Sequence, residues 1–561
     1  MTNKAIAQQL KLAGNLVELT GGNPFKARAY ASSARSMETL EQPAADLAKA
    51  GMLEDAYGIG KSIAGDIEEL LETGEISAAT EMLSTIPPGL LDVLNVKGLG
   101  PKKVRALWQE LDIVSLDDLE GAAVAGRLAT LPGFGKKTAE NVLKSIEQLQ
   151  AYAGKAHYGQ VFDDITGIVE ALQGVDGIEN VEATGDFRRQ LEVVDRVELV
   201  VEGDQNSILD ALSSSGSVMQ RPEDGGDFCG QTSFGLPITV HLAAEESFGN
   251  ILWTTTGSDA HVEAFIERYG EPEDTDDEEL IFDNAGLRDI PPALREGAGE
   301  LKAAEEDILP DVLTLEDMKG TLHNHTTYSD GAHTLREMTS AARAMGLEYF
   351  GVCDHSRSLQ VAHGLSIEKL MEQLDAIVEL NEEYASDGGP PFWIFSGTEC
   401  DVLADGSMDY PDDVLEKLDV VVASIHTNFG LPETKQTERM LNAAANPHVD
   451  ILGHLTGRLL LKRNGYPIDH AAVIEACAEH NTCIELNANP WRLDLDWRWI
   501  RQATDVGILI AINPDAHAME QLKLVRWGVM AAQKGWLTAE QCLNTKSADE
   551  LADWLNGRNT A

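Results

Sequence analysis

From Gly320 to the C-terminus, short apolar runs that end in His, Asp or Asn alternate with stretches of helical periodicity. Runs of this kind are typical of buried strands, and their alternation with helices predicts a parallel sheet or barrel. In such folds the functional side chains gather where the strands end. The runs are YFGVCD, VVVASIH, DILGH, CIELN and ILIAINPD, which begin at residues 349, 420, 450, 483 and 508.

The predicted strand ends carry nine imidazole and carboxylate groups. In an HxH pair on a strand, such as His323 and His325, both rings share a face and can reach one metal ion. Nine groups exceed the needs of one ion, so we expect two or three divalent metals bridged by a carboxylate such as Glu399. Ligands without thiolate suit zinc, manganese or iron. The predicted metal ligands are His323, His325, Asp330, His355, Glu399, His426, His454, Asp515 and His517.

Other polar residues near these strand ends are candidates for supporting roles. Asp354 directly precedes His355, and we take it as a candidate catalytic group. Arg458 and Lys462 follow His454 and could neutralise phosphate charge, with an exposed basic segment as the alternative. The remaining histidines of this region, His333, His363, His448, His470 and His480, are interpreted as surface or structural residues.

A Gly-x-Gly turn followed by lysine occurs three times in the N-terminal 150 residues, each time before a helical run. Two glycines allow a tight turn whose backbone N–H groups can meet a phosphate, and lysine adds positive charge. Plain helix–helix turns are the alternative, but three repeats favour the helix-hairpin-helix pattern of sequence-independent DNA binding. The predicted contact residues are Gly58, Gly60, Lys61, Gly98, Gly100, Lys102, Lys103, Gly133, Gly135, Lys136 and Lys137.

The charge balance limits the class of protein. The 561 residues include 93 Asp and Glu against 43 Lys and Arg, a net charge of −50, which by itself argues against a nucleic-acid partner. The lysines clustered at the hairpins reverse that inference. The acid excess then needs another cause, and a salt-rich cytoplasm is our hypothesis. The run Glu271–Leu280 is expected to be a solvated acidic loop.

Cysteine usage and hydropathy predict the compartment. Six scattered cysteines make neither a zinc spacing nor a disulfide framework, which indicates a reduced cytoplasm. No apolar run has the length of about 20 residues that spans a bilayer. The N-terminus also lacks the apolar core of a signal peptide, so we expect a cytoplasmic protein without a membrane partner.

Taken together, the C-terminal motifs resemble the PHP family of metal-dependent phosphoesterases, from Gly320 to about Leu555. The resemblance implies a distorted (βα)7 barrel with three metals, which would lower the pKa of a shared water and hold phosphate oxygens. It implies a first metal held by His323, His325, Glu399 and Asp515, a second held by Glu399, His426 and His454, and a third held by Asp330, His355 and His517.

The rest of the chain resembles family X DNA polymerases. The likeness rests on the hairpins and on NPFKARAY at 23–30, GDFRR at 185–189, ESFG at 246–249, TGS at 256–258 and IPP at 290–292. It implies a multidomain α+β and α/β protein that ends in the PHP barrel. The implied parts are a helical DNA-binding domain at 1–85, a helix-hairpin-helix segment at 86–150, a palm at 151–245, a thumb at 246–300, a linker at 301–319 and the PHP domain at 320–561.

The palm departs from the family pattern where catalysis takes place. Nucleotidyl transfer uses three carboxylates that hold two Mg²⁺ ions. In this chain, Arg196 and Glu198 stand at the positions of the family's Asp-x-Asp pair, and His241 stands at the position of the third carboxylate. Asp186 replaces the family's serine before Arg-Arg. A register shift would make Asp195 a candidate, but it still lacks its second acid. We therefore expect no magnesium in the palm and no polymerase activity.

Two lysines of the family are also replaced. Asp259 stands where the family has lysine after TGS, which weakens nucleotide binding. Asp66 stands where relatives that remove deoxyribose phosphate have a Schiff-base lysine, and an acid cannot form the imine. Both replacements argue against the repair chemistries of the N-terminal and palm domains.

These observations predict a DNA-repair-type phosphoesterase whose barrel acts on 3′ ends or gaps, as a 3′–5′ exonuclease or end-trimming enzyme. Its partner would be gapped or 3′-ended DNA, and activities of this kind in the family are usually manganese-dependent. One alternative is a gap-filling polymerase with an accessory PHP nuclease. Others are a non-catalytic DNA-binding scaffold with structural metals, and a small-molecule phosphatase, which would have no use for the hairpins.

Overall fold

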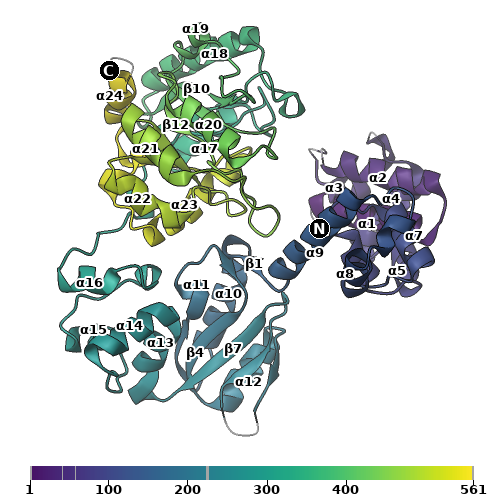
Figure 1. Cartoon of the computed structure of the whole chain (residues 1–561), viewed down its shortest axis with the longest axis horizontal. Coiled ribbons are helices and arrows are strands. Elements are labelled where there is room, and N and C mark those ends of the chain that lie inside the picture. The colour runs from purple at the N-terminus through teal and green to yellow at the C-terminus, as the bar shows by residue number, and fades with distance from the viewer. Residues whose placement is uncertain (1–2, 39, 41, 57, 223–225, 559–561) are drawn as a thin grey trace. The chain divides into compact units, whose positions relative to one another are not determined.

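The computed structural model describes residues 3–38, 40, 42–56, 58–222 and 226–558 (Figure 1). By their contacts these residues form two compact units, Met1–Ala153 and Gly154–Ala561. The first unit holds all three Gly-x-Gly turns, and the second holds the predicted palm, thumb and barrel.

The first unit is helical. One hydrophobic core runs from Ile6 to Ile146, so the predicted segments 1–85 and 86–150 share their interior. At each turn the residue between the glycines is buried in this core, which directs the glycine backbone outward. The helices are α1 (Asn3–Thr20), α2 (Pro24–Glu38), α3 (Ala44–Ala50), α4 (Lys61–Thr73), α5 (Ser77–Ser84), α6 (Leu90–Leu94), α7 (Pro101–Leu111), α8 (Leu116–Val124) and α9 (Lys136–Tyr152).

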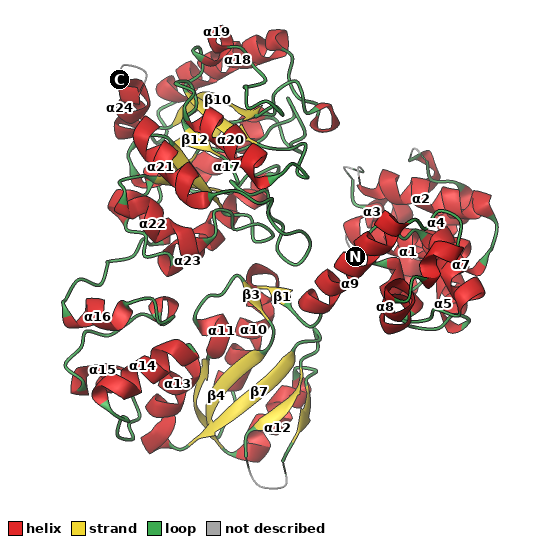
Figure 2. Ribbon diagram, in the orientation of Figure 1, coloured by secondary structure: helices red, strands yellow, loops and turns green. Residues whose placement is uncertain are grey.

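The palm region is a mixed sheet with the strand order β2-β4-β7-β6-β5, and α10 and α12 pack against it (Figure 2). The parallel pair β4 and β7 lies inside the sheet, with β2 on one side of it and β6 on the other. β1 and β3 form a separate two-stranded antiparallel sheet. The elements are β1 (Ala156–His157), α10 (Tyr158–Gln173), β2 (Ile178–Ala183), α11 (Gly185–Arg188), β3 (Val193–Val194), β4 (Val197–Gly203), α12 (Gln205–Ser214), β5 (Val218–Gln220), β6 (Phe228–Gln231) and β7 (Pro237–Ala243).

The thumb region has its own core around Trp253, Phe265 and Phe282. The predicted linker 301–319 is more ordered than expected, because Leu301 and Leu309 are buried in this core. The acidic loop is also partly buried: Glu278 receives hydrogen bonds from Arg188 and Arg295, so the expectation of a fully solvated loop was wrong at that residue. The helices are α13 (Phe248–Thr256), α14 (Asp259–Tyr269), α15 (Glu279–Asn284) and α16 (Glu300–Glu305).

The C-terminal region is the predicted barrel. Its strands pair in the order β14-β13-β12-β11-β10-β9-β8, each parallel to its neighbour, with helices outside (Figure 1). The edges approach where His325 N donates to Ala516 O at 2.8 Å, which nearly closes the sheet. The strands are β8 (Gly320–Thr321), β9 (Tyr349–Val352), β10 (Trp393–Asp401), β11 (Val420–Ser424), β12 (Ile451–Leu452), β13 (Cys483–Asn487) and β14 (Ile510–Asn513).

The helices of the barrel follow the strands along the chain, which confirms the predicted strand–helix alternation. They are α17 (Leu335–Ala344), α18 (Ile367–Ser386), α19 (Asp412–Leu415), α20 (Glu433–Ala444), α21 (His470–His480), α22 (Ile500–Asp505), α23 (Val525–Lys534) and α24 (Ala548–Arg558).

Palm and barrel share a hydrophobic core. Tyr158 and Phe187 of the palm stack at a centroid distance of 4.8 Å, and Trp527 of α23 meets Tyr158 edge-on at 5.8 Å. Lys534, at the end of α23, is buried and donates to the carbonyl of Arg189 at 2.9 Å and to Glu296 at 2.5 Å. Breaking a buried, hydrogen-bonded ion pair is costly, so these contacts fix the palm and thumb to the barrel.

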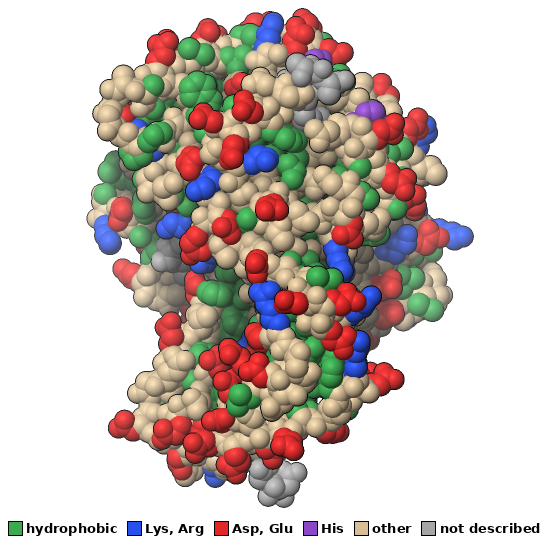
Figure 3. Space-filling model, turned by 90° about the vertical axis from the view of Figure 1, so that its left-hand side faces the viewer, with side chains coloured by type: hydrophobic (Ala, Val, Ile, Leu, Met, Phe, Trp, Pro, Cys, Tyr) green, Lys and Arg blue, Asp and Glu red, His purple; other side chains and the backbone are tan. Residues whose placement is uncertain are grey.

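The surface reflects the composition. Figure 3 shows Asp and Glu side chains across the visible face, most densely in its lower part, with fewer Lys and Arg among them. None of the helices within the described ranges is long and apolar enough to cross a bilayer.

Candidate metal centre

The nine predicted ligands converge at the carboxyl-terminal edge of the barrel sheet. Each lies in a strand or in the loop that follows one, and parallel strands all end at the same edge. His323 and His325 follow β8 and are not part of a regular strand, yet their ring centroids lie 5.2 Å apart. Glu399 lies within β10, and the others follow β8, β9, β11, β12 and β14.

Glu399 lies at the centre of the cluster. Its Oε1 is 2.9 Å from His454 Nε2, 3.2 Å from His426 Nε2 and 3.4 Å from His323 Nε2. Its Oε2 is 2.8 Å from His355 Nδ1. A carboxylate with ring nitrogens around both oxygens has the geometry of a bridging ligand.

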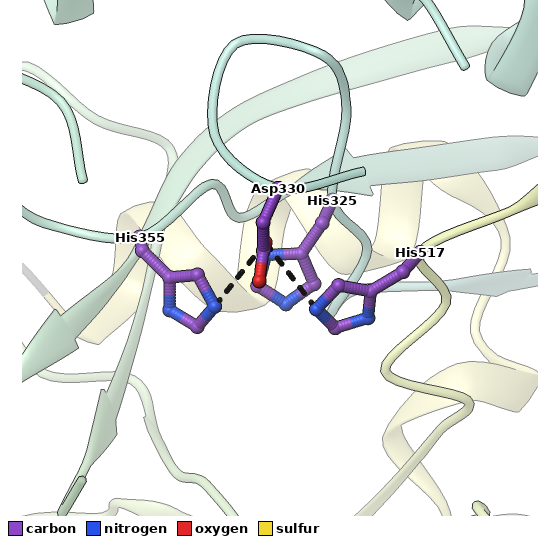
Figure 4. Close-up of side chains that lie close together, drawn as sticks. All are labelled: His325, Asp330, His355 and His517. Carbon is purple, nitrogen blue, oxygen red and sulfur yellow. Dashed lines mark ion pairs between the residues drawn. The ribbon is translucent and has the colours of Figure 1, made fainter. Parts of the chain in front are cut away.

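The outer side of the cluster is formed by His325, Asp330, His355 and His517 (Figure 4). Asp330 Oδ1 lies 3.4 Å from His517 Nε2 and 3.5 Å from His355 Nε2. The side chains of Asp330 and His517 are about one-third exposed, whereas His325 is fully buried. The cluster therefore opens to solvent at Asp330 and His517.

The groups of neighbouring ligand atoms overlap with the three metal-ligand sets that the family resemblance implies, but their members differ. Among the described residues, ligand atoms close enough to share an ion form the groups His325–Asp330–His355–His517, His323–His325–Asp515 and His355–Glu399–His426. His325 and His355 thus each belong to two groups. His454 lies outside these groups, although its ring reaches Glu399.

The donor atoms have the properties that divalent ions require. His323 Nε2, His325 Nδ1 and His454 Nδ1 are buried without a hydrogen-bond partner, which is costly unless a further group satisfies them. Burial, together with His517 and His355, lowers the pKa of His325 to about 3, so its ring is neutral and can donate a lone pair. Although burial opposes ionisation, His426, His323 and His355 hold the pKa of Glu399 well below its usual range. The residues therefore fit a multinuclear centre.

Two carboxylates that the sequence analysis missed orient the ligands. Glu485 of β13 is buried, and its Oε1 lies 2.7 Å from His323 Nδ1 while its Oε2 accepts from the backbone N–H of His454 at 2.7 Å. Asp401 Oδ1 lies 2.6 Å from His426 Nδ1. A carboxylate on the far nitrogen fixes the tautomer and the direction of a metal-binding ring. The signal in the sequence was a Glu inside the apolar run CIELN, since a buried charge needs partners.

Replacing Glu485 with glutamine is expected to weaken metal binding by about 10- to 100-fold, the usual cost of losing such a partner. The amide has one acceptor oxygen and cannot hold both the His323 ring and the His454 backbone. Competition with a chelating dye measures the affinity. Glu475→Gln on the exposed face of α21 is the matched control, and equal affinities in the two variants would contradict a positioning role.

Asp354 and Arg458 make contacts that differ from those of a group facing substrate. The buried carboxylate of Asp354 accepts from Thr326 N at 2.8 Å, from Ser329 Oγ at 2.5 Å and from Gln373 Nε2 at 2.6 Å. Arg458 pairs with Asp496 and donates to the carbonyl of Arg492 at 2.9 Å. These bonds give Asp354 the role of shaping the 326–329 loop and give Arg458 the role of holding the 492–496 loop.

A different cation faces the centre. Arg492 Nε lies 3.9 Å from Asp515 Oδ2, and its Nη1 is buried without a hydrogen-bond partner. A guanidinium with a free donor beside metal ligands is suited to a phosphate oxygen. Lys462, the other predicted cation, is exposed.

The three predicted hairpins have one shared backbone geometry. Gly58, Gly98 and Gly133 have φ values of 80°, 86° and 84°, a left-handed conformation that favours glycine. The second glycines, Gly60, Gly100 and Gly135, are the N-caps of α4, α7 and α9 with extended backbones. A Cβ on five of these six glycines would meet open space, so their backbones are accessible, whereas a Cβ on Gly58 would lie 2.6 Å from Ser36 Oγ. The lysines that follow lie beside these helix starts, where an anion is favoured.

Asp186, Arg196 and Glu198 line a cleft of about 600 Å³. Arg196 Nε lies 3.2 Å from Asp195, and Asp186 pairs with Arg189. His241 Nδ1 lies 2.7 Å from Asp227, and its Nε2 is 3.7 Å from Glu198. Although burial opposes it, hydrogen bonds to Glu198 and Asp227 raise the pKa of His241. Within the described ranges, no group of ligand atoms close enough to share a metal includes a palm residue.

Comparison with protein families gives the class. A helix-hairpin-helix domain matches residues 1–76, a SAM-like helix-hairpin-helix tandem matches 90–148, and a PHP domain matches 321–489. With the barrel and its clustered ligands, these matches define a PHP-domain protein of the metal-dependent phosphoesterase class. The two helix-hairpin-helix matches indicate that it binds DNA.

Comparison with individual proteins gives the family. The DNA polymerase/3′-5′ exonuclease PolX of Bacillus subtilis (strain 168) is 33% identical over 577 residues, which cover 99% of each chain. The chain therefore belongs to the PolX family. Two proteins named probable phosphatase are each 26% identical to this chain. The one from Thermoanaerobacter sp. (strain X514) matches 40% of this chain and 89% of its own length, and the one from Shewanella pealeana (strain ATCC 700345 / ANG-SQ1) matches 42% and 92%.

Proposed function

We propose that the barrel hydrolyses phosphodiester bonds at DNA 3′ ends, as a 3′–5′ exonuclease or 3′-end-processing enzyme, while the hairpins hold the DNA backbone. The observation that carries the proposal is the set of buried, unpartnered ligand atoms around Glu399, open to solvent at Asp330 and His517. A purely structural site is closed and needs about four ligands. The Bacillus subtilis relative is named as a 3′-5′ exonuclease, which supports the same reaction.

The residues divide the work as follows. The nine ligands would hold two or three ions of manganese, zinc or iron, which supply a water of lowered pKa and charge for phosphate oxygens. Arg492 donates to a non-bridging phosphate oxygen and so fixes the phosphate beside Asp515. Glu485 and Asp401 keep the rings of His323 and His426 directed at the centre. Asp354 holds the loop that carries Asp330.

A matrix of metals and substrates tests this proposal. The purified chain is stripped of metal and supplied with Mn²⁺, Zn²⁺, Fe²⁺ or Mg²⁺, together with single-stranded, gapped and 3′-phosphate DNA and a small phosphomonoester. We expect nucleotide release from 3′ ends with Mn²⁺ and none from Asp515→Ala. Release from the small ester alone would favour a small-molecule phosphatase, and no release from any substrate would favour a scaffold with structural metals.

Charge reversal at a hairpin is expected to weaken DNA binding without changing sequence preference. The double variant Lys136→Glu/Lys137→Glu places two acids at the start of α9, and it should lower the slope of log K against log salt by about 0.7–0.9 for each lysine lost. Fluorescence anisotropy across a salt series measures this slope.

Lys144→Glu provides the control, because Lys144 is exposed on the same helix about two turns further along. It should alter the slope much less than either exchange at the hairpin. Equal effects per charge would show that net charge, and not the hairpin, governs binding.

A further inference from the structure

Trp491 is an exposed aromatic side chain at the mouth of the barrel. It lies in the loop after β13, is 41% exposed, and directly precedes Arg492, whose guanidinium reaches Asp515. Large aromatic side chains bury 150–250 Å² when covered, so an indole left partly open beside a polar centre offers a large apolar surface to a ligand. The position next to the phosphate-facing arginine limits what that ligand can be.

The loop of Trp491 is held in place by its backbone. Trp491 O accepts from Leu460 N at 2.8 Å, and Trp491 N donates to Asn489 Oδ1 at 3.1 Å. The next carbonyl, that of Arg492, accepts from Arg458 Nε at 2.9 Å. The indole is therefore presented by a fixed loop, and a ring fixed before binding loses little entropy when a ligand stacks on it.

The palm braces the ring from behind. His157 of β1 lies against Trp491 with ring centroids 4.7 Å apart and an interplanar angle of 35°. The same imidazole bonds through Nε2 to the carbonyl of Leu460 at 2.9 Å, so one side chain contacts both the ring and the segment that holds it. A Cβ on Gly159 would come within 2.9 Å of Pro490, which shows how closely palm and loop pack.

We propose that Trp491, braced by His157, stacks on the nucleobase of the nucleotide being removed while Arg492 holds its phosphate. This inference rests on the proposed nuclease function and names its substrate subsite. Stacking tolerates every base because each has a π-face, which suits an end-processing enzyme without sequence preference. It also gives the palm a part in the barrel's chemistry that needs no palm metal.

Kinetics on two matched substrates test the subsite. One is single-stranded DNA with a normal 3′-terminal nucleotide, and the other ends in an abasic nucleotide with the same phosphodiester. Trp491→Ala is expected to raise KM for the normal end by about tenfold, which is within the range for one stacked base. It should leave kcat for the normal end, and both KM and kcat for the abasic end, unchanged. Trp491→Phe should retain most of the affinity. Trp393→Ala, which removes a tryptophan that is 47% exposed at the start of β10, is the control and should change neither.

A second readout does not depend on hydrolysis. DNA with a 3′-terminal 5-iodouracil is irradiated with the metal-free full-length chain, and the cross-linked peptide is identified by mass spectrometry. A cross-link at Trp491 supports stacking even if the chain releases no nucleotide, in which case only the proposed hydrolysis fails. The proposed subsite would be overturned if Trp491→Ala raised KM equally for the normal and the abasic end, or if the cross-link were confined to other residues.

Discussion

Replacing Glu399 with glutamine is expected to lower the rate of phosphodiester hydrolysis by about three orders of magnitude, since each factor of ten corresponds to about 1.4 kcal/mol and a metal ion contributes several. Oxygens of Glu399 lie within 3.4 Å of nitrogens on His454, His426, His323 and His355, so one exchange affects every part of the cluster. The amide keeps the volume but loses the negative charge that a shared ion requires.

The same variant is expected to bind fewer ions. Mass spectrometry of the metal content should find at least one ion per chain fewer than in the wild type, and nucleotide release from 3′-ended DNA measures the rate. Glu379→Gln, on the exposed face of α18, makes the same chemical change away from the barrel mouth. Unchanged metal content together with an unchanged rate would refute the bridging role of Glu399.

The barrel and its ligands were predictable because two strong patterns coincide. Apolar runs fixed the strands, and the parallel arrangement forces all their ends to one edge, so the residues at those ends had to meet. Asp330 and His517 stand in the loops beyond β8 and β14, so the pattern placed them near the strand ends but did not show which other ligands they face.

The supporting shell was not predictable from the patterns used. Glu485 stands out in the sequence as an acid inside an apolar run, but its pairing with His323, and that of Asp401 with His426, follows only from the tertiary structure. Arg458 looks like a free cation in the sequence, but the fold pairs it with Asp496, and Arg492 takes the place beside Asp515. Pairings of this kind join residues that are distant in sequence, so they depend on tertiary structure.

The link between palm and barrel was also hidden. Trp527, Lys534 and His157 lie in segments that periodicity assigns to separate domains, yet they join the two regions through one core and several hydrogen bonds. A domain boundary inferred from composition marks a change of pattern and does not show whether the two interiors merge.

The palm is expected to incorporate no nucleotide, with either Mg²⁺ or Mn²⁺, on a primed and gapped template. Two of the three positions that should hold metal-binding carboxylates carry Arg196 and His241, and the pKa of His241 is raised by its acidic neighbours despite burial. The fixed positive charge of Arg196, beside an imidazole whose protonation its acidic neighbours favour, opposes the binding of divalent ions at this place. Asp186 is also engaged, because it pairs with Arg189.

The surrounding contacts support the same expectation. Arg188 of the palm and Arg295 of the thumb share the buried Glu278, and Lys534 of the barrel bonds to both regions. A thumb held by buried charge pairs on two sides has little freedom to close on an incoming nucleotide.

Primer extension in the background of His323→Ala measures this activity without degradation of the product by the barrel. The PolX protein of Bacillus subtilis, which is named as a DNA polymerase, is the positive control. Template-directed incorporation that persists in His323→Ala would show that Glu198 and Asp195 suffice for metal binding. If no nucleotide is incorporated while the wild type still hydrolyses 3′ ends, the palm has a structural role. His157 and Lys534 join it to the barrel whether or not it holds a metal.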